Sequence, residues 1–176
     1  MPQRLDPRLD ILPAAQQQIW TSLASAPHLG FVLYGGTAIA LQLGHRESLD
    51  FDFFRSEPID KDQIRAKFQF VRGSAILQDA PETLVVLAEM PAGAVKVSFY
   101  GGIGFSRVND PLQTRDGTLL IASLDDLMAT KLKATLDRAE AKDYRDIAEM
   151  ISAGISLGAG LSAFKQTVNR RRFCAR

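Results

Sequence analysis

The sequence predicts an α+β protein in which a small mixed sheet is flanked by helices and followed by C-terminal helices. Segments with the period-two alternation of strands lie only in the first part of the chain. Two of them, 83–88 and 94–100, flank a short turn and therefore form a hairpin, which requires antiparallel pairing. From Ser123 onward the apolar residues recur at helical spacing. We therefore expect a core at 1–122 and a helical extension at 123–176, packed as a single compact unit.

The first half of the chain alternates predicted helices and strands. Ile19, Trp20 and Leu23 are spaced to share one helical face after Pro13. Apolar and acidic residues alternate at 49–53, the pattern of a strand with one buried face. In order, we expect a helix after Pro13 that closes at 27–30, a strand at 31–34, a helix at 37–43, a strand at 49–53 and a helix at 60–68.

The second half continues from the hairpin into helices. A short strand is expected at 118–121. Ser123 with Asp126 three positions later fits a helix N-cap followed by an acidic residue. Glycines at 154, 158 and 160 mark a later break in the helical part.

Composition narrows the class of protein. A chain of 176 residues with 46% apolar and 23% charged residues can bury one good core. No apolar run approaches the roughly 20 residues of a membrane span, and the first ten residues lack the layout of a signal peptide, so we expect a cytoplasmic protein without a membrane partner. Cys174, the only cysteine, excludes an intramolecular disulfide and a cysteine metal cage. The net charge of +1 does not indicate a nucleic-acid partner, and the basic run 170–172 is typical of a solvated tail.

The strand at 49–53 carries the most informative polar residues. Ser48, Asp50 and Asp52 project from one face, and the apolar residues between them from the other. Carboxylates two positions apart stand roughly 6–7 Å apart at their Cα atoms, so their side chains can converge on a cation. Magnesium is held by a few carboxylates and completed by substrate phosphates. The alternative is an amphipathic edge strand that shows polar residues to water.

Residues on either side of the predicted helix 37–43 are candidates for phosphate contacts. Gly35 and Gly36 lie at a strand-to-helix junction, where backbone N–H groups and the helix dipole favour an anion, although ordinary turn glycines have the same pattern. Arg46 has the planar fork that suits phosphate oxygens, or is a solvated cation at a helix end. Ser48 is a weaker candidate for a phosphate contact, and we expect His45 to be structural.

Two segments resemble a known family. The run GGTAIALQLGHRESLDFDF at 35–53 resembles the signature of the DNA polymerase beta nucleotidyltransferase superfamily, and its form is most similar to the AbiEii-type toxins of type IV toxin–antitoxin systems. The run KLKA at 131–134, then Arg138 and the run KDYRD at 142–146, resembles that family's later stretch. The resemblance spans 31–151.

The resemblance implies a fold, a reaction and partners. The fold is a minimal polymerase-beta-type nucleotidyltransferase core, and the reaction is a magnesium-dependent transfer of a nucleoside monophosphate from a nucleoside triphosphate to an acceptor hydroxyl. For some members the acceptor is tRNA, and the usual partner is an antitoxin protein. Carried onto this sequence, the roles are Asp50 and Asp52 as Mg²⁺ ligands, Gly35, Gly36, Ser48 and Arg46 as phosphate contacts, Lys131 as a phosphate or leaving-group contact, and Asp143 as a base or auxiliary ligand.

One departure from the superfamily pattern keeps other functions open. Members usually place a third carboxylate on a later strand, where this chain has Ser98 in the segment 95–99. Glu89, Asp143 and Asp146 are the acids considered as replacements, and the resemblance favours Asp143. The alternatives are a small-molecule adenylyltransferase, such as an antibiotic-modifying enzyme, and a nucleotidyltransferase-fold binding module with impaired catalysis.

Helical geometry separates two neighbouring lysines. At about 100° per residue, Lys131 falls within the inward arc of its helix, whereas Lys133 falls opposite it. Arg138 lies on the same line as Lys131. An inward lysine needs a negative partner, which is either a triphosphate in a polar cleft or Asp143 in a structural ion pair. The inward sets also include, on the first helix, Leu127, Met128, Leu132, Thr135 and Leu136, and on the next, Asp143, Tyr144, Ile147, Met150 and Ile151.

Overall fold

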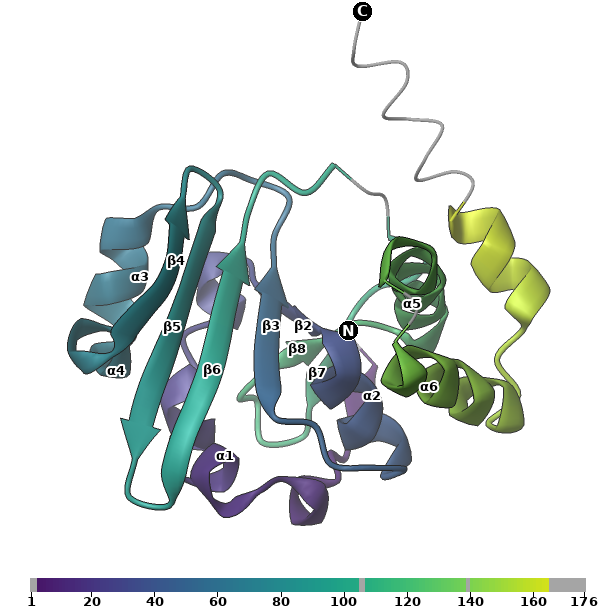
Figure 1. Cartoon of the computed structure of the whole chain (residues 1–176), viewed down its shortest axis with the longest axis horizontal. Coiled ribbons are helices and arrows are strands. Elements are labelled where there is room, and N and C mark those ends of the chain that lie inside the picture. Colours follow the sequence, from purple (N-terminus) through teal and green to yellow (C-terminus); the bar gives the residue numbers. More distant parts are fainter. Residues whose placement is uncertain (1–2, 105–106, 139, 165–176) are drawn as a thin grey trace, which may run out of the picture.

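The computed structural model describes residues 3–104, 107–138 and 140–164. Cys174 and the basic run 170–172 lie outside these ranges. Within them the strands form one eight-stranded sheet in the order β1-β7-β8-β2-β3-β6-β5-β4 (Figure 1). The strands are β1 Arg4–Leu5, β2 Val32–Tyr34, β3 Asp50–Phe54, β4 Ala75–Ala80, β5 Thr83–Met90, β6 Gly93–Tyr100, β7 Leu112–Thr114 and β8 Leu120–Ile121.

The sheet is mixed, as the sequence predicts. Strand β3 runs antiparallel to β2 and parallel to β6. Strands β5 and β6 form the expected antiparallel hairpin around the turn at 91–92. The α+β class is therefore confirmed, and the parallel β3–β6 pair lies near the middle of the sheet.

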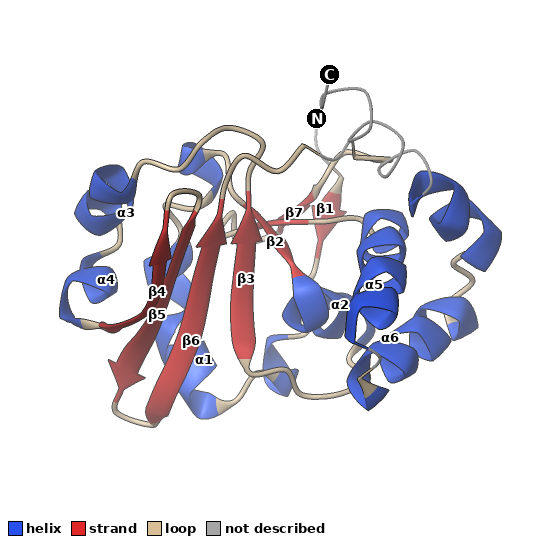
Figure 2. Cartoon of the chain, turned by 45° about the horizontal axis from the view of Figure 1, so that its top comes forward, coloured by secondary structure: helices blue, strands red, loops and turns tan. Residues whose placement is uncertain are grey.

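Helices cover the sheet at its back and at both ends (Figure 2). Helix α1 packs against β5 and β6, and α3 and α4 lie beside β4 and β5 at one end. Helix α5 packs against α6 and α2 at the other end. The helices are α1 Ala14–Ile19, α2 Gly35–Leu43, α3 Lys61–Lys67, α4 Gln69–Gly73, α5 Leu124–Arg138 and α6 Ala141–Ser152, and residues 157–164 are helical as well.

The core is built on phenylalanine rings from β3 and its neighbours. Phe51, Phe53 and Phe99 are fully buried, and the rings of Phe53 and Phe99 stack with centroids 5.6 Å apart. Phe31 meets the ring of Phe99 edge-on at 5.3 Å. Burying each such ring contributes about 1.5 to 3 kcal/mol. Because β3 alternates, burial of its phenylalanines turns its aspartates to the opposite face.

Side chains cap two of the helices, and the sequence predicts the first of these caps. The Ser123 hydroxyl accepts from the backbone N–H of Asp126 at 3.2 Å and donates to its carboxylate at 2.7 Å, so α5 begins with a capping pair. Asp60 caps α3 by accepting from two backbone N–H groups, each at 3.0 Å.

Other expectations are wrong for physical reasons. Strand β4 was not expected because its residues are almost all exposed and show no alternation. Helix α2 begins at Gly35 rather than Thr37. Leu136 is 74% exposed, because the buried residues of α5 end at Lys131 and its last turns project past the core. Tyr144 and Ile151, also expected to face inward, are exposed as well.

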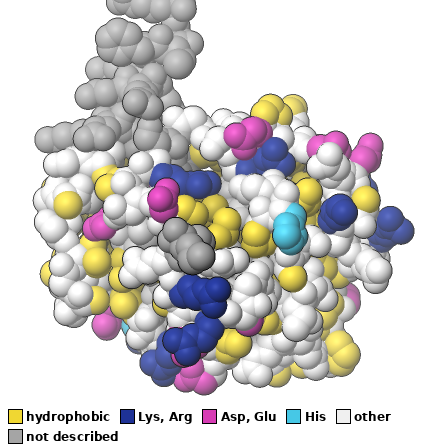
Figure 3. Space-filling model, turned by 180° about the vertical axis from the view of Figure 1, so that it is seen from behind, with side chains coloured by type: hydrophobic (Ala, Val, Ile, Leu, Met, Phe, Trp, Pro, Cys, Tyr) yellow, Lys and Arg dark blue, Asp and Glu magenta, His cyan; other side chains and the backbone are white. Residues whose placement is uncertain are grey.

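The described part of the face seen from behind has no single dominant type of side chain (Figure 3). Seen from behind, the molecule shows basic and acidic side chains scattered among apolar ones over the part of the chain that the structure describes (Figure 3). Among the described helices, none is both long enough and apolar enough to cross a membrane. The division between a core and an extension at residue 122 stays a prediction.

Candidate functional site

The parallel pairing of β3 and β6 places polar residues from the two strands side by side. Asp50 lies opposite Lys96, and Asp52 lies opposite Ser98. With the start of α2 and parts of α5 and α6, Asp50, Asp52 and Lys96 line a pocket of about 450 Å³, whereas Ser98 is buried beneath it. Such a volume is within the range of small-molecule sites. Its lining residues are Gly35, Gly36, Arg46, Glu47, Ser48, Leu49, Asp50, Asp52, Lys96, Tyr100, Lys131, Arg138 and Lys142.

The glycine pair allows side chains to approach the start of α2 closely. Gly35 has φ of 76°, and a Cβ there would lie 2.7 Å from Asp52 Oδ2. A Cβ on Gly36 would lie 2.5 Å from Arg46 Nη2 and 2.9 Å from Ser48 Oγ. Gly35 therefore requires glycine because of its positive φ, whereas a side chain at Gly36 would displace Arg46 and Ser48. The glycines also put the N-terminus of α2, with its backbone N–H groups, at the edge of the pocket.

Helix α2 is fixed to the carboxylate strand by a buried hydroxyl. Thr37, in the first turn of the helix, donates a hydrogen bond to the backbone carbonyl of Asp50. Thr37 is 1% exposed, so water competes little for this contact. The glycine pair and the two aspartates are thereby held in one rigid unit.

The two aspartates have different surroundings. Asp50 Oδ2 lies 2.8 Å from the Lys96 ammonium, and this hydrogen bond raises the pKa of Lys96. Asp52 is more deeply placed, and burial together with the charge of Asp50 raises the pKa of its carboxyl, although Ser98 and two lysines oppose the shift. A carboxylate whose charge is disfavoured in the free protein gains from a cation that binds beside it.

The position opposite Asp52 holds a neutral residue. Ser98 is fully buried and makes no hydrogen bond of full geometry, although it lies close enough to lower the pKa of Asp52. Glu89 pairs with Ala94 next to the hairpin turn and does not line the pocket. Among residues 3–104, 107–138 and 140–164, no group of three His, Cys, Asp or Glu side chains is arranged to hold a metal ion. The oxygen donors of Asp50 and Asp52 suit one hard cation that substrate phosphates complete.

A second cluster of charges joins α5, α6 and the loop after α2. Lys131 Nζ lies 2.7 Å from Asp143 and 2.7 Å from Asp146. Arg46 makes a two-pronged contact with Asp146, both distances being 2.7 Å, and His45 Nε2 lies 2.7 Å from the same carboxylate. Both aspartates are fully buried.

These buried carboxylates are stabilised as anions. Burial alone would raise the pKa of Asp146, but hydrogen bonds from His45, Arg46 and Lys131 lower it far below its ordinary value. Burial likewise opposes ionisation of Asp143, whereas Arg138, at 3.0 and 3.2 Å, and Lys131 lower its pKa. Asp143 and Asp146 are therefore ionised, and each is paired with basic side chains.

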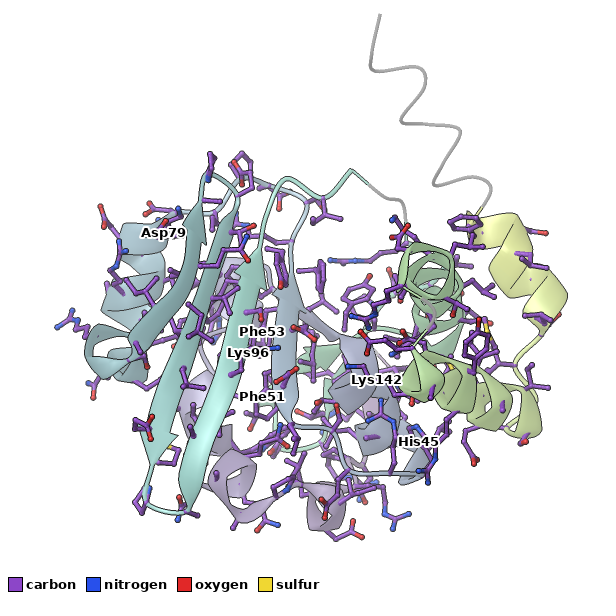
Figure 4. The ribbon with its side chains drawn as sticks, viewed as in Figure 1. His45, Phe51, Phe53, Asp79, Lys96 and Lys142 are labelled. Carbon is purple, nitrogen blue, oxygen red and sulfur yellow. The ribbon has the colours of Figure 1, made fainter. Side chains whose placement is uncertain are left out.

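The structure brings most of the predicted site residues together. Gly35, Gly36, Ser48, Arg46, Asp50, Asp52 and Lys131 all line the one pocket, and Figure 4 shows its sheet side at Lys96 and its helix side at Lys142. Lys131 faces inward and is 5% exposed, as helical geometry predicts, whereas Lys133 faces outward and pairs with Asp137. Asp143 does not line the pocket, because Lys131 and Arg138 take up its carboxylate.

The sequence analysis did not identify Lys96 as a site residue. Its only local signal is the alternation of β6, which turns Lys96, Ser98 and Tyr100 to one face. The charge balance of the pocket depends on it: five cations (Arg46, Lys96, Lys131, Arg138, Lys142) face three acids (Glu47, Asp50, Asp52). The lining itself therefore favours an anion, and three of its cations, Arg46, Lys131 and Arg138, also pair with the buried Asp143 and Asp146 behind it.

Comparisons with known proteins agree with the geometry. Residues 19–173 match the family model described as the nucleotidyl transferase AbiEii toxin of a type IV toxin–antitoxin system. A protein of Aquifex aeolicus (strain VF5), uncharacterized protein aq_aa25, is 30% identical over 119 residues, which cover 66% of this chain and 55% of that protein. The chain thus spans about half the length of this curated relative.

Two solved structures share the fold. A crystal structure from H. pylori, described provisionally as a nucleotidyltransferase, superposes with a TM-score of 0.53 at 21% identity, over 73% of this chain and 61% of that one. The solution structure of the antibiotic-resistance factor ANT(2'')-Ia superposes with a TM-score of 0.59 at 15% identity, over 89% and 91% of the two chains. At these identities the likeness concerns the fold.

Proposed function

The chain belongs to the AbiEii nucleotidyl transferase toxin family of type IV toxin–antitoxin systems, and from this premise we propose that it transfers a nucleoside monophosphate from a nucleoside triphosphate to an acceptor hydroxyl. One observation carries the proposal. The paired carboxylates Asp50 and Asp52 lie against the glycine-rich start of a helix, in a pocket whose cations outnumber its acids. This combination suits a triphosphate and one Mg²⁺ ion.

The residues divide between the metal and the phosphates. Asp50 and Asp52 are the proposed Mg²⁺ ligands, and the bound ion would supply charge neutralisation on the phosphoryl oxygens. Phosphate oxygens accept hydrogen bonds from the backbone N–H groups at Gly35 and Gly36 and from the Ser48 hydroxyl. Arg46 and Lys131 are each anchored by Asp146, so their charges are already positioned before the substrate binds.

The reaction is an in-line displacement. The acceptor hydroxyl oxygen forms a bond to the α-phosphorus and releases its proton to solvent, as the bond from that phosphorus to the bridging oxygen of the β-phosphate breaks and pyrophosphate leaves. Lys131 and Arg46 stabilise the negative charge of the leaving pyrophosphate. Asp143 acts in this proposal by positioning Lys131 and Arg138, rather than as a base or a metal ligand.

We propose RNA, and in the family context tRNA, as the acceptor. Two features at the edge of the pocket support an RNA substrate. The side chains of Arg138 and Lys142 are 48% and 50% exposed and can meet a phosphate backbone. Tyr100, four residues after Lys96 on β6, lines the same pocket and stacks on Phe54 with ring centroids 4.8 Å apart, so it offers an aromatic ring at the pocket. The family context also supports an antitoxin as the protein partner.

Labelled triphosphates test this proposal directly. The protein is incubated with each α-labelled nucleoside triphosphate and Mg²⁺ in the presence of total tRNA, total protein or aminoglycosides, and the products are separated. Label on tRNA is the expected result. Label on an aminoglycoside would replace the proposal by antibiotic modification, the function suggested by the fold shared with ANT(2'')-Ia. Absence of label on every acceptor, with the triphosphate intact, would leave a binding module without catalysis.

Expression in a host tests the toxin role separately. Since transfer to tRNA removes an essential substrate of translation, expression of the chain should slow growth, and expression of the Asp52→Ala variant at the same level should not. Unimpaired growth with an enzyme that transfers label in vitro would contradict the toxin role but not the transfer reaction.

A further inference from the structure

Lys96 occupies a position next to the proposed metal site that the sequence analysis did not assign. We propose that its ammonium group takes the place of a second divalent cation beside Asp50, so that the site binds one Mg²⁺ ion per chain. The inference rests on the proposed function, since it concerns how the same pocket neutralises the triphosphate.

The contact between Lys96 and Asp50 is built into the sheet. The parallel register sets the two residues directly opposite each other, and Lys96 Nζ lies 2.8 Å from Asp50 Oδ2. Each side chain is 38% exposed, and both line the pocket. The pair is therefore accessible to a substrate, and the ammonium group already stands where a cation shared with Asp50 would lie.

The pocket also has too few ligands for two ions. Sites with two divalent cations place them about 3.5–4 Å apart and clamp both substrate oxygens of the displacement. Each Mg²⁺ ion is usually held by one or two carboxylates together with waters and substrate phosphates. Here the strand position opposite Asp52 carries the neutral Ser98. The remaining acid of the lining, Glu47, is exposed, and within the described ranges no three potential ligands cluster. A first ion can use Asp52 and one oxygen of Asp50, whereas a second ion would need the other oxygen of Asp50, which Lys96 occupies.

The charge of Lys96 disfavours a second ion as well. An ammonium within hydrogen-bond distance of Asp50 repels a divalent cation that approaches the same oxygen, and it neutralises the carboxylate that would attract that cation. The same ammonium attracts a phosphoryl oxygen of the substrate. The Lys96 ammonium thus supplies the charge of a second cation at a site that has Ser98 in place of a third carboxylate.

The number of bound ions can be counted with Mn²⁺ as the probe. The folded full-length chain is mixed with an α,β-methylene nucleoside triphosphate, which cannot be cleaved at that bond, and Mn²⁺ is added while electron paramagnetic resonance measures free Mn²⁺. We expect one bound Mn²⁺ per chain for the unsubstituted protein and for Lys96→Arg, which keeps the charge. We expect two for Lys96→Met at millimolar Mn²⁺, because Asp50 is then free.

The matched control is Lys133→Met, which removes the same charge from an exposed lysine outside the pocket lining. It should bind one Mn²⁺. Two ions in the unsubstituted chain, or one ion in a folded Lys96→Met variant, would overturn the inference. If the unsubstituted chain binds two ions and labels tRNA, the inference about Lys96 is wrong but the proposed function stands. If it binds one ion but labels no acceptor, the inference stands but the proposed function is wrong. If it binds no Mn²⁺, both are wrong.

Discussion

Two pairs of aspartates in this protein have opposite environments. Asp50 and Asp52 lie on a strand at the edge of a pocket, and the pKa of Asp52 is raised by burial and by its acidic neighbour. Asp143 and Asp146 lie on a helix, are fully buried, and have lowered pKa values because four basic side chains surround them. In the first pair, Lys96 contacts Asp50, whereas four basic side chains contact the second pair.

The difference separates residues that bind from residues that position. Carboxylates that are short of positive charge can take up a cation that arrives with the substrate. Buried carboxylates that several cations already contact cannot, but they hold those cations in place. Asp146 contacts Arg46 and Lys131 at once, and both of these line the pocket. The buried cluster therefore holds two cations at the pocket without lining the pocket itself.

The largest expected effect on stability is at Asp146. Replacing it by Ala leaves His45 and Arg46 without their shared carboxylate and Lys131 with only Asp143. Removing one partner from a buried ion pair typically costs about 3–5 kcal/mol. We expect a loss of that size in the free energy of unfolding by urea denaturation. If Asp146→Ala is as stable as Asp50→Ala, the two pairs of aspartates do not differ in the way described.

A smaller effect is expected at Lys131, since each aspartate keeps other partners. We expect Lys131→Ala to destabilise the protein by about 1–3 kcal/mol and to remove most transfer activity, with a weakened thermal shift on addition of triphosphate and Mg²⁺. Lys133→Ala is the matched control, because its exposed pair with Asp137 contributes at most about 1 kcal/mol. A Lys131→Ala variant that is destabilised but binds and transfers nucleotide normally would make the lysine purely structural.

Acid should weaken the buried cluster gradually. Asp143 and Asp146 have folded pKa values below their ordinary ones, so below about pH 4 the unfolded chain binds more protons than the folded one. Their contribution is fully present above the unfolded pKa and is lost as the pH falls toward the folded values. The free energy of unfolding should therefore decrease from about pH 4 downward, and in Asp143→Asn this decrease should be less steep. An equally steep decrease in that variant would assign the acid sensitivity to other carboxylates.

Local patterns made part of this site predictable. The alternation of β3 assigned its phenylalanines to the core and its aspartates to the other face, and the glycine pair marked the start of α2. The helical spacing of Lys131 indicated an inward lysine that needs a negative partner. Each inference used residues close in sequence, where the geometry of one element fixes the side-chain directions.

Contacts between distant segments were beyond the same reasoning. Lys96 lies next to Asp50 only because β3 and β6 pair in parallel and in this register, which neither strand specifies by itself. The partners of Asp146 come from α5 and from the loop after α2, and the sequence analysis considered only the pairing of Lys131 with Asp143. Leu136 fits the inward helical pattern, but α5 continues past the core at that point.

The central claim is that Asp50 and Asp52 carry nucleotidyl transfer while Asp143 and Asp146 support them. The most direct measurement is the rate at which an α-labelled triphosphate labels tRNA with the unsubstituted chain, Asp50→Ala and Asp52→Ala, each checked by its thermal melt. Loss of one electrostatic contributor typically lowers a rate about a hundredfold or more. We therefore predict at least that loss in both variants, with unfolding temperatures close to that of the unsubstituted chain. Transfer at an undiminished rate by either folded variant would contradict the assignment.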